Sequence, residues 1–183
     1  MAEKSTAVLI SIQPKWCKLI ASGEKTVEVR KTRPSVETPL LCFIYECGNK
    51  GRKKIVGEFL CDKIVEIYNC CDVHNELPSR PCEYYLDWDS DDDIPTMACL
   101  SYKELGYYIG KEGAGYAWHI SNLIIYDQPK ELSHLQKPCS HNCYHCKYYC
   151  TSSLEEPAYC EWVDCVITKP PQSWRYVEDD GNE

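Results

Sequence analysis

The residues best suited to chemistry lie close together in one stretch, from Ile10 to Lys31. They are Trp16, Lys25, Thr26, Glu28 and Arg30. An ammonium beside a carboxylate can pair with a phosphate or take part in proton transfer, and a guanidinium offers a planar fork to a phosphate or a base edge. An indole can stack on a base. The stretch therefore predicts a pocket for a ligand that is anionic and flat, such as a nucleotide or a nucleic-acid base.

Local patterns predict the elements that position these side chains. Ala7–Ile12 is an apolar run typical of a strand. A proline at the first turn and a glycine after the last favour a short helix over Pro14–Ser22. Thr26–Arg30 alternates between apolar and polar residues, which is typical of a strand. One face of that strand, exposed or facing a pocket, carries Thr26, Glu28 and Arg30.

The rest of the chain predicts more short strands and one further helix. The expected strands are Leu40–Glu46, Ile55–Ile67 with a bend near Cys61-Asp62, Gly115–Tyr126 and Trp174–Val177. Ser101 and Glu104 form a capping-box pattern, so a short helix begins at Ser101. Asn69–Cys99 has no clean period and holds three prolines, which predicts a long loop or insertion. Many short strands with two short helices predict an α+β fold, a small mixed β-barrel.

Composition limits the classes of partner. The 183 residues fit one domain with a small appendage. The net charge is −8, yet residues 1–60 hold 11 Lys and Arg against 6 Asp and Glu. This distribution argues against indiscriminate coating of nucleic acid and for a local basic site; alternatively, the acidic excess only keeps the protein soluble. The oligomeric state is not indicated.

No stretch of the sequence predicts a signal peptide or a membrane span. The expected location is therefore the cytoplasm. Fourteen cysteines in a cytosolic chain are then expected to be thiols or metal ligands rather than disulfides.

The segment Lys137–Thr168 is rich in cysteine and predicts a small metal-stapled insert. Cys143 and Cys146 have the spacing of a zinc knuckle, since two intervening residues let both thiolates reach one tetrahedral ion. Metal binding would supply the folding energy that this short polar segment lacks. The predicted structural zinc ligands are Cys139, Cys143, Cys146 and Cys165, with Cys150, Cys160, His141 and His145 as further candidates. The alternative is a set of free thiols packed as small hydrophobes.

Two other motifs resemble metal sites. The spacing from Cys139 to Cys146 also matches the iron–sulfur signature of radical enzymes, but too few residues follow for their large α/β barrel. The acidic run Asp87–Asp93 lacks the glycine and glutamate that an EF-hand loop requires, so we interpret it as a solvated loop. Cys70-Cys71 has no role that the sequence indicates.

A set of motifs over most of residues 7–126 resembles the ASCH domain family. The motifs are I-x-P-x-W, G-x-K-T-x-E-x-R, V-G-E-F and W-H-I-S. The residues that carry them are Pro14, Trp16, Gly23, Lys25, Thr26, Glu28, Arg30, Gly57, Glu58, Phe59, Trp118, His119 and Ser121. The resemblance implies a PUA-like barrel over residues 1–136, with 69–100 as a loop or insertion, then the insert 137–168 and a returning strand and tail in 169–183. The tail PPQSWRYV and the cysteine-rich insert resemble those of phage and prophage members.

The resemblance also implies a cleft for RNA, a nucleotide or a nucleoside. Its expected ligand-binding residues are Trp16, Lys25, Thr26, Glu28, Arg30, Glu58, Trp118, His119 and Trp174. Some small ASCH proteins are amidohydrolases on acetylated cytidine that use a lysine, a threonine and a glutamate. Their lysine aligns with Lys25, but Glu28 stands where their threonine falls, and Thr26 lies off that position. Lys25 and Glu28 are the candidate catalytic residues.

Structural roles remain open for several of these residues. Glu28 and Arg30 could form an ordinary salt bridge, Trp16 and Trp118 could be core residues, His119 could be structural, and Glu58 could face solvent. Three functions follow. They are a binding module for RNA or a nucleotide, a small hydrolase acting on a modified cytidine or on RNA, and a phage protein that sequesters a host signalling nucleotide.

Overall fold

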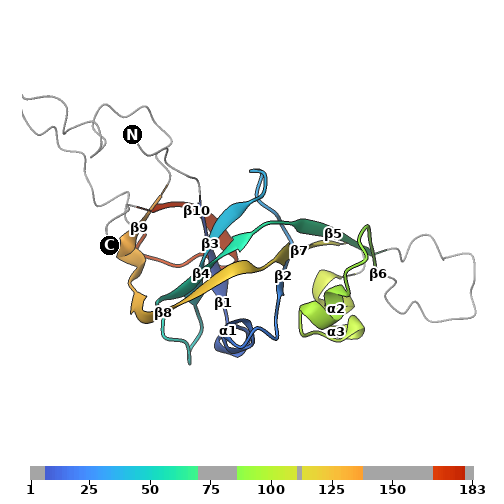
Figure 1. Ribbon diagram of the computed structural model, residues 1–183, viewed down its shortest axis with the longest axis horizontal. Helices are drawn as coiled ribbons and strands as arrows, with labels where there is room; N and C mark the ends of the chain where they lie inside the picture. Colours follow the sequence, from blue (N-terminus) through green and yellow to red (C-terminus); the bar gives the residue numbers. More distant parts are fainter. Residues whose placement is uncertain (1–6, 70–85, 111–112, 138–166, 180–183) are drawn as a thin grey trace, which may run out of the picture.

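The computed structural model describes residues 7–69, 86–110, 113–137 and 167–179 as two β-sheets with a few short helices (Figure 1). In chain order the strands are β1 Ala7–Ile12, β2 Val27–Arg30, β3 Leu40–Glu46, β4 Ile55–Cys61, β5 Ile64–Asn69, β6 Leu86–Trp88, β7 Ala114–His119, β8 Ser121–Lys130, β9 Leu135–Gln136 and β10 Trp174–Asp179. The helices are α1 Pro14–Ala21, α2 Ile94–Met97, α3 Tyr102–Ile109 and the 3-10 turn η1 Leu132–His134. This β-dominated half-barrel agrees with the predicted α+β class.

The larger sheet is built around β1. Its strand order is β8-β4-β3-β1-β10-β9, with β1 parallel to β3 and antiparallel to β10. Every residue of β1 is buried, as the continuous apolar run predicted. The smaller sheet has the order β2-β7-β5-β6, and α2 and α3 lie together beside it (Figure 1).

Two predicted strands are each divided between the sheets. The segment predicted as one bent strand, 55–67, is β4 in the larger sheet and β5 in the smaller one, with the corner at Asp62 and Lys63. The segment predicted as one long strand, 115–126, divides at Ile120 into β7 and β8 in the same way. The bend predicted near Cys61-Asp62 is confirmed as the first of these corners. Predicting 115–126 as one unbroken strand was wrong, because extended residues continue through the corner at Ile120 and leave the sequence pattern unbroken.

The helices show which local signals decide structure. α1 begins at Pro14 as predicted, and Ser101 caps α3 with both halves of its capping box. α2 lies within the segment predicted as a long loop, and the Asp93 side chain caps it by accepting from Thr96 N at 3.3 Å. Ile94 anchors this short helix in the core of the smaller sheet. In its described part, residues 69 and 86–99, the predicted loop therefore contains the end of β5, β6 and α2.

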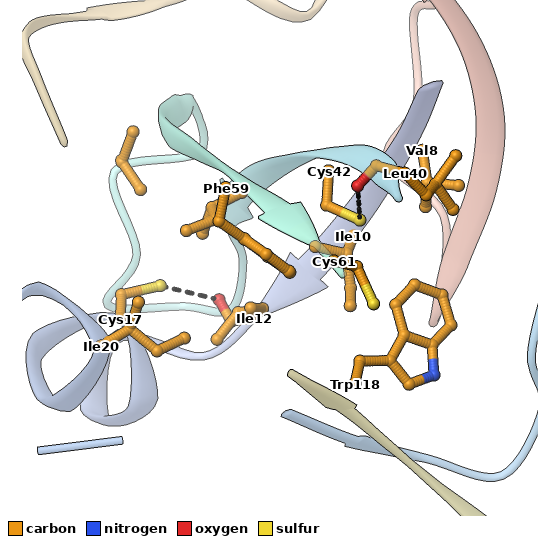
Figure 2. Packing of buried hydrophobic residues seen from close by; sticks show 12 residues of the cluster. Val8, Ile10, Ile12, Cys17, Ile20, Leu40, Cys42, Phe59, Cys61 and Trp118 are labelled. Atoms are coloured by element: carbon orange, nitrogen blue, oxygen red, sulfur yellow. Dashed lines mark hydrogen bonds between the residues drawn. The ribbon is translucent and has the colours of Figure 1, made fainter. Parts of the chain in front are cut away.

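A core cluster on the larger sheet includes three of the cysteines, Cys17, Cys42 and Cys61. Cys42 and Cys61 pack with Ile10 and the fully buried indole of Trp118, as Figure 2 shows. These thiols behave as small hydrophobes. The described residues offer no group of three or more metal-binding side chains. The predicted zinc ligands Cys139, Cys143, Cys146 and Cys165 lie outside the described residues, and so does Cys70-Cys71. No described helix is long and apolar enough to cross a membrane.

Candidate functional site

A pocket of about 240 Å³ opens where β1 ends, between α1, β2 and α3. Both sheets contribute to it, together with the segment that leads into β10. Its lining residues are Ser11, Ile12, Gln13, Trp16, Lys25, Glu28, Val29, Arg30, Cys47, Leu100, Tyr108 and Gln172. The stretch that the sequence singled out thus supplies a large part of the wall.

Three buried charges form one side of this pocket. Glu28 Oε2 lies 3.3 Å from Lys25 Nζ, and Glu28 Oε1 lies 3.0 Å from Arg30 Nη2. The Lys25 side chain is 3% exposed and that of Glu28 is 9% exposed. β2 is buried along its whole length, so the predicted polar face of this strand lies against the pocket rather than in open solvent. We call Lys25, Glu28 and Arg30 the charged triad.

Backbone carbonyl groups hold the two cations in place. Lys25 Nζ donates to the carbonyl oxygen of Ala98 at 2.8 Å, in the residue that follows α2. Arg30 Nη2 donates to the carbonyl oxygen of Ser11 at 2.6 Å, near the end of β1. These bonds connect the triad to both sheets, so its geometry is set by the fold and does not need a ligand.

The protonation of Lys25 responds to this environment. Burial lowers the pKa of Lys25 below its usual value, and the adjacent Glu28 carboxylate offsets part of that shift. The lysine therefore gives up a proton more readily than an exposed one would. Glu28 is held between two cations, which suits a fixed hydrogen-bond acceptor better than a free nucleophile.

Aromatic rings with nearby lysines lie around the mouth. Lys25 Nζ lies 5.0 Å from the centroid of the Trp16 ring, and Lys15 Nζ lies 4.2 Å from the same ring. Lys31 Nζ lies 5.5 Å from the centroid of Tyr108. Both rings line the pocket, one from α1 and one from α3. Such an arrangement can stack a flat ring and pair with negative charge close to it.

Of the predicted ligand-binding residues, four come together and five do not. The pocket collects Trp16, Lys25, Glu28 and Arg30. Trp118 lies in the core, and Trp174 packs on it with ring centroids 5.7 Å apart. Glu58 on β4 accepts a hydrogen bond from the Tyr126 hydroxyl. The backbone of Thr26 bonds to Met97, and its side chain is absent from the pocket lining.

His119 belongs to a different cluster at the acidic loop. Its Nε2 lies 3.5 Å from Asp92 Oδ2, and Lys63 Nζ lies 2.7 Å from the same oxygen. Burial lowers the pKa of His119, while Asp92 raises it in part. Asp92 thus ties the acidic loop to β7 and to the β4–β5 corner. The other four aspartates of the run are exposed, as the solvated loop predicted.

Several lining residues had no counterpart in the sequence prediction. Tyr108 comes from α3, Gln172 from the segment before β10, and Cys47 from the end of β3. They are far from Lys25 along the chain, and only the folded topology brings them to it. The sequence signal that could have indicated Tyr108 is the pair of adjacent tyrosines, Tyr107 and Tyr108, in a predicted short helix.

Together, the two-sheet half-barrel and its basic, aromatic pocket define a PUA-like protein. The sequence model of the ASCH domain matches residues 10–167, so the chain belongs to the ASCH domain family. Membership of this family suggests RNA binding as the general class of function.

Solved structures of an ASCH protein share the fold. Crystal structures of two mutant forms of the ASCH protein from Zymomonas mobilis are similar to this chain at 17% identity, with TM-scores of 0.52 and 0.53. Each alignment covers 93% of this chain, and 88% and 87% of those chains respectively. No curated protein sequence matches significantly.

Proposed function

We propose that this protein binds RNA by taking one nucleotide unit into the pocket. The observation that carries the proposal is the charged triad in a pocket that Trp16 also lines, with Lys25 Nζ 5.0 Å from the Trp16 ring centroid. Its two cations and one carboxylate give the wall a formal charge of +1, and they present both donors and an acceptor. The edge of a base also carries both hydrogen-bond donors and acceptors, so it can pair with this wall. A phosphate alone would be repelled by the Glu28 carboxylate.

The capacity of the triad for further hydrogen bonds supports a ligand. Lys25 Nζ has three N–H groups, and the structure gives them two partners, Ala98 and Glu28. The buried Nε of Arg30 has no hydrogen-bond partner among the described residues, and a buried donor without a partner costs about 1–3 kcal/mol. The third N–H of Lys25 therefore is the donor of the triad that remains for a ligand.

The size of the pocket also favours a single unit. Its volume of about 240 Å³ is small for a ligand site, since typical sites measure roughly 300–1,000 Å³. One ring system fits such a space, and a helical nucleic acid does not. The expected partner is therefore a nucleotide unit of single-stranded RNA, with Trp16 as its stacking residue.

Binding of fluorescently labelled single-stranded RNA tests the proposal. Trp16→Ala should weaken the affinity by about 5–150-fold, the loss that corresponds to about 1–3 kcal/mol of base stacking. The matched control is Lys137→Gln, an exposed residue that follows β9 at the edge of the larger sheet. Equal affinity of the wild type and Trp16→Ala would contradict the proposal.

A hydrolase is the second candidate, and one observation favours it. Lys25 has a lowered pKa and lies 3.3 Å from a carboxylate inside a pocket, an arrangement able to transfer protons. Incubation with acetylated cytidine and with short RNA tests it. If the wild type forms product and Lys25→Ala does not, the protein is an enzyme and the pure binding function is wrong. The binding proposal expects no product from either protein.

A further inference from the structure

The face of α3 beside the pocket has a second hollow. It is lined by Ser101, Lys103, Glu104 and Tyr107. Lys103 and Tyr107 are four residues apart and share one side of the helix, and Ser101, Glu104 and Tyr107 follow at intervals of three. The hollow therefore runs along α3 from its capped start to its last turn.

Tyr107 has no packing role that explains it. Its side chain is 79% exposed, while Leu105 and Ile109 of the same helix are buried in the core of the smaller sheet. The Tyr107 ring is therefore free to contact a ligand in the hollow that it lines. Tyr108, the next residue, lines the first pocket. Consecutive tyrosines thus face two adjacent spaces.

The pocket and the hollow both lie along α3, and a lysine lies near both of them. Leu100 lines the pocket and Ser101 lines the hollow, so the α3 start also separates them. Lys15 lies over Trp16, and it also lowers the pKa of Glu104, although hydrogen bonds from Ser101 dominate that shift. Lys15 therefore lies over a ring that lines the pocket and close enough to Glu104, which lines the hollow, to act on its charge.

We infer that the hollow on α3 is a second nucleotide subsite, in which the base adjacent to the one in the pocket stacks on Tyr107. The phosphate that joins the two units would meet Lys15, which lies near both spaces. The inference rests on the proposed function and deepens it, because it names a strand of single-stranded RNA of at least two nucleotides as the ligand, rather than a free mononucleotide.

Basic side chains lie at both spaces. Lys103 lines the hollow together with Glu104, and Lys31 lies over Tyr108 at the pocket. On the other side of the pocket, Cys47 begins a loop whose Lys50 and Lys53 are exposed. Basic side chains interleaved with aromatic rings are the usual means of binding a single strand.

The experiment compares ribonucleotides of different length by calorimetry. Mononucleotides and the matching dinucleotides of all four bases are titrated into the wild type and into Tyr107→Ala. In the wild type, the best dinucleotide should bind about 5–150-fold more tightly than its mononucleotide. Tyr107→Ala should abolish that gain and leave the mononucleotide affinity unchanged. Because Tyr107 is exposed, the variant should fold, and its thermal unfolding should confirm this.

Tyr68→Ala is the matched control, since Tyr68 is an exposed tyrosine on β5 with 48% exposure. It should bind both ligands as the wild type does. A dinucleotide that binds no better than the mononucleotide, or a Tyr107→Ala variant that keeps the gain, would overturn the second subsite while leaving the pocket intact. Failure of every ribonucleotide to bind, or mononucleotide binding that Trp16→Ala does not weaken, would overturn the subsite together with the proposed function.

Discussion

Glu28 lies directly opposite Trp118 in the antiparallel pairing of β2 and β7. Residues paired in this way project from the same face of a sheet, so a carboxylate and a fully buried indole are neighbours. The charged triad therefore borders the core that Trp118 joins, and not open water. This position explains why Glu28 has two cationic partners, because a buried charge without partners is strongly unfavourable.

Removal of the carboxylate should destabilise the fold. Glu28→Gln leaves Lys25 and Arg30 buried without their countercharge, and breaking a buried ion pair costs about 3–5 kcal/mol. The free energy of unfolding, measured with urea, should fall by that amount. The control is Glu37→Gln, an exposed carboxylate whose loss should change stability by no more than about 0.5 kcal/mol. Equal stability of both variants would show that Glu28 is not the electrostatic partner of the triad.

Alkaline pH should destabilise the protein because of three thiols in one core cluster. Burial raises the pKa of Cys17 and of Cys61 from 9.0 to about 12, and it raises that of Cys42 as well. Above pH 9 the unfolded chain releases these protons and the folded chain retains them, so stability falls as pH rises. Each thiol contributes roughly 1.4 kcal/mol per pH unit, or about 4 kcal/mol for the three.

Lys25 has the opposite effect on stability. Its pKa in the folded chain is lower than the value of 10.5 in the unfolded chain, so its contribution to stability rises as pH rises toward 10.5. One group does not offset three, so the thiols should dominate. Urea unfolding between pH 8 and pH 11 measures the effect, and Cys42→Ala should remove about 1.4 kcal/mol per pH unit from the decline above pH 9. A stability that is constant over this range would refute the assignment.

Close backbone approach at Gly57 should make this position intolerant of a side chain. A Cβ there would lie 2.4 Å from the carbonyl oxygen of Ile124, where β4 pairs with β8. Gly57→Ala should cost about 3 kcal/mol and increase hydrogen exchange along β8, since the strands must separate. Gly23→Ala is the comparison: its φ of +77° strains alanine, but no atom obstructs the Cβ. It should leave exchange in β8 near that of the wild type, and equal exchange in both variants would contradict the steric explanation.

The sequence predicted those helices whose ends are fixed by residues close together in the chain. A proline at the first turn marked α1, and the Ser101–Glu104 box marked α3. The bend near Cys61-Asp62 was predicted, but the change of sheet at that bend and the corner at Ile120 were not, because the chain stays extended while it passes from one sheet to the other. Only pairing with distant strands reveals the change of sheet.

The residues of the site likewise divide into those that local sequence predicts and those that depend on distant contacts. The alternation of one strand predicted that Glu28 and Arg30 share a wall. It also placed Thr26 there, whereas the pocket takes Lys25, which precedes β2. Trp118 and Trp174 have the residue type of a stacking platform, yet they pack on each other, because residue type does not decide which side of a sheet faces the core. Tyr108 reaches the pocket through the placement of α3, which depends on contacts across the whole smaller sheet.

The cysteine-rich segment leads to the last prediction, which concerns metal content. Cys143 and Cys146 have the spacing of a zinc knuckle, and Cys139 and Cys165 are the proposed remaining ligands. Elemental analysis of protein purified without chelators should find about one zinc per chain. The double variant Cys143→Ser with Cys146→Ser should lose it, because a tetrahedral site does not survive with two thiolates removed. Cys99→Ser is the control, since Cys99 lies at the end of α2 and outside the segment, and it should retain the metal. A metal-free protein with the segment intact would instead favour free thiols.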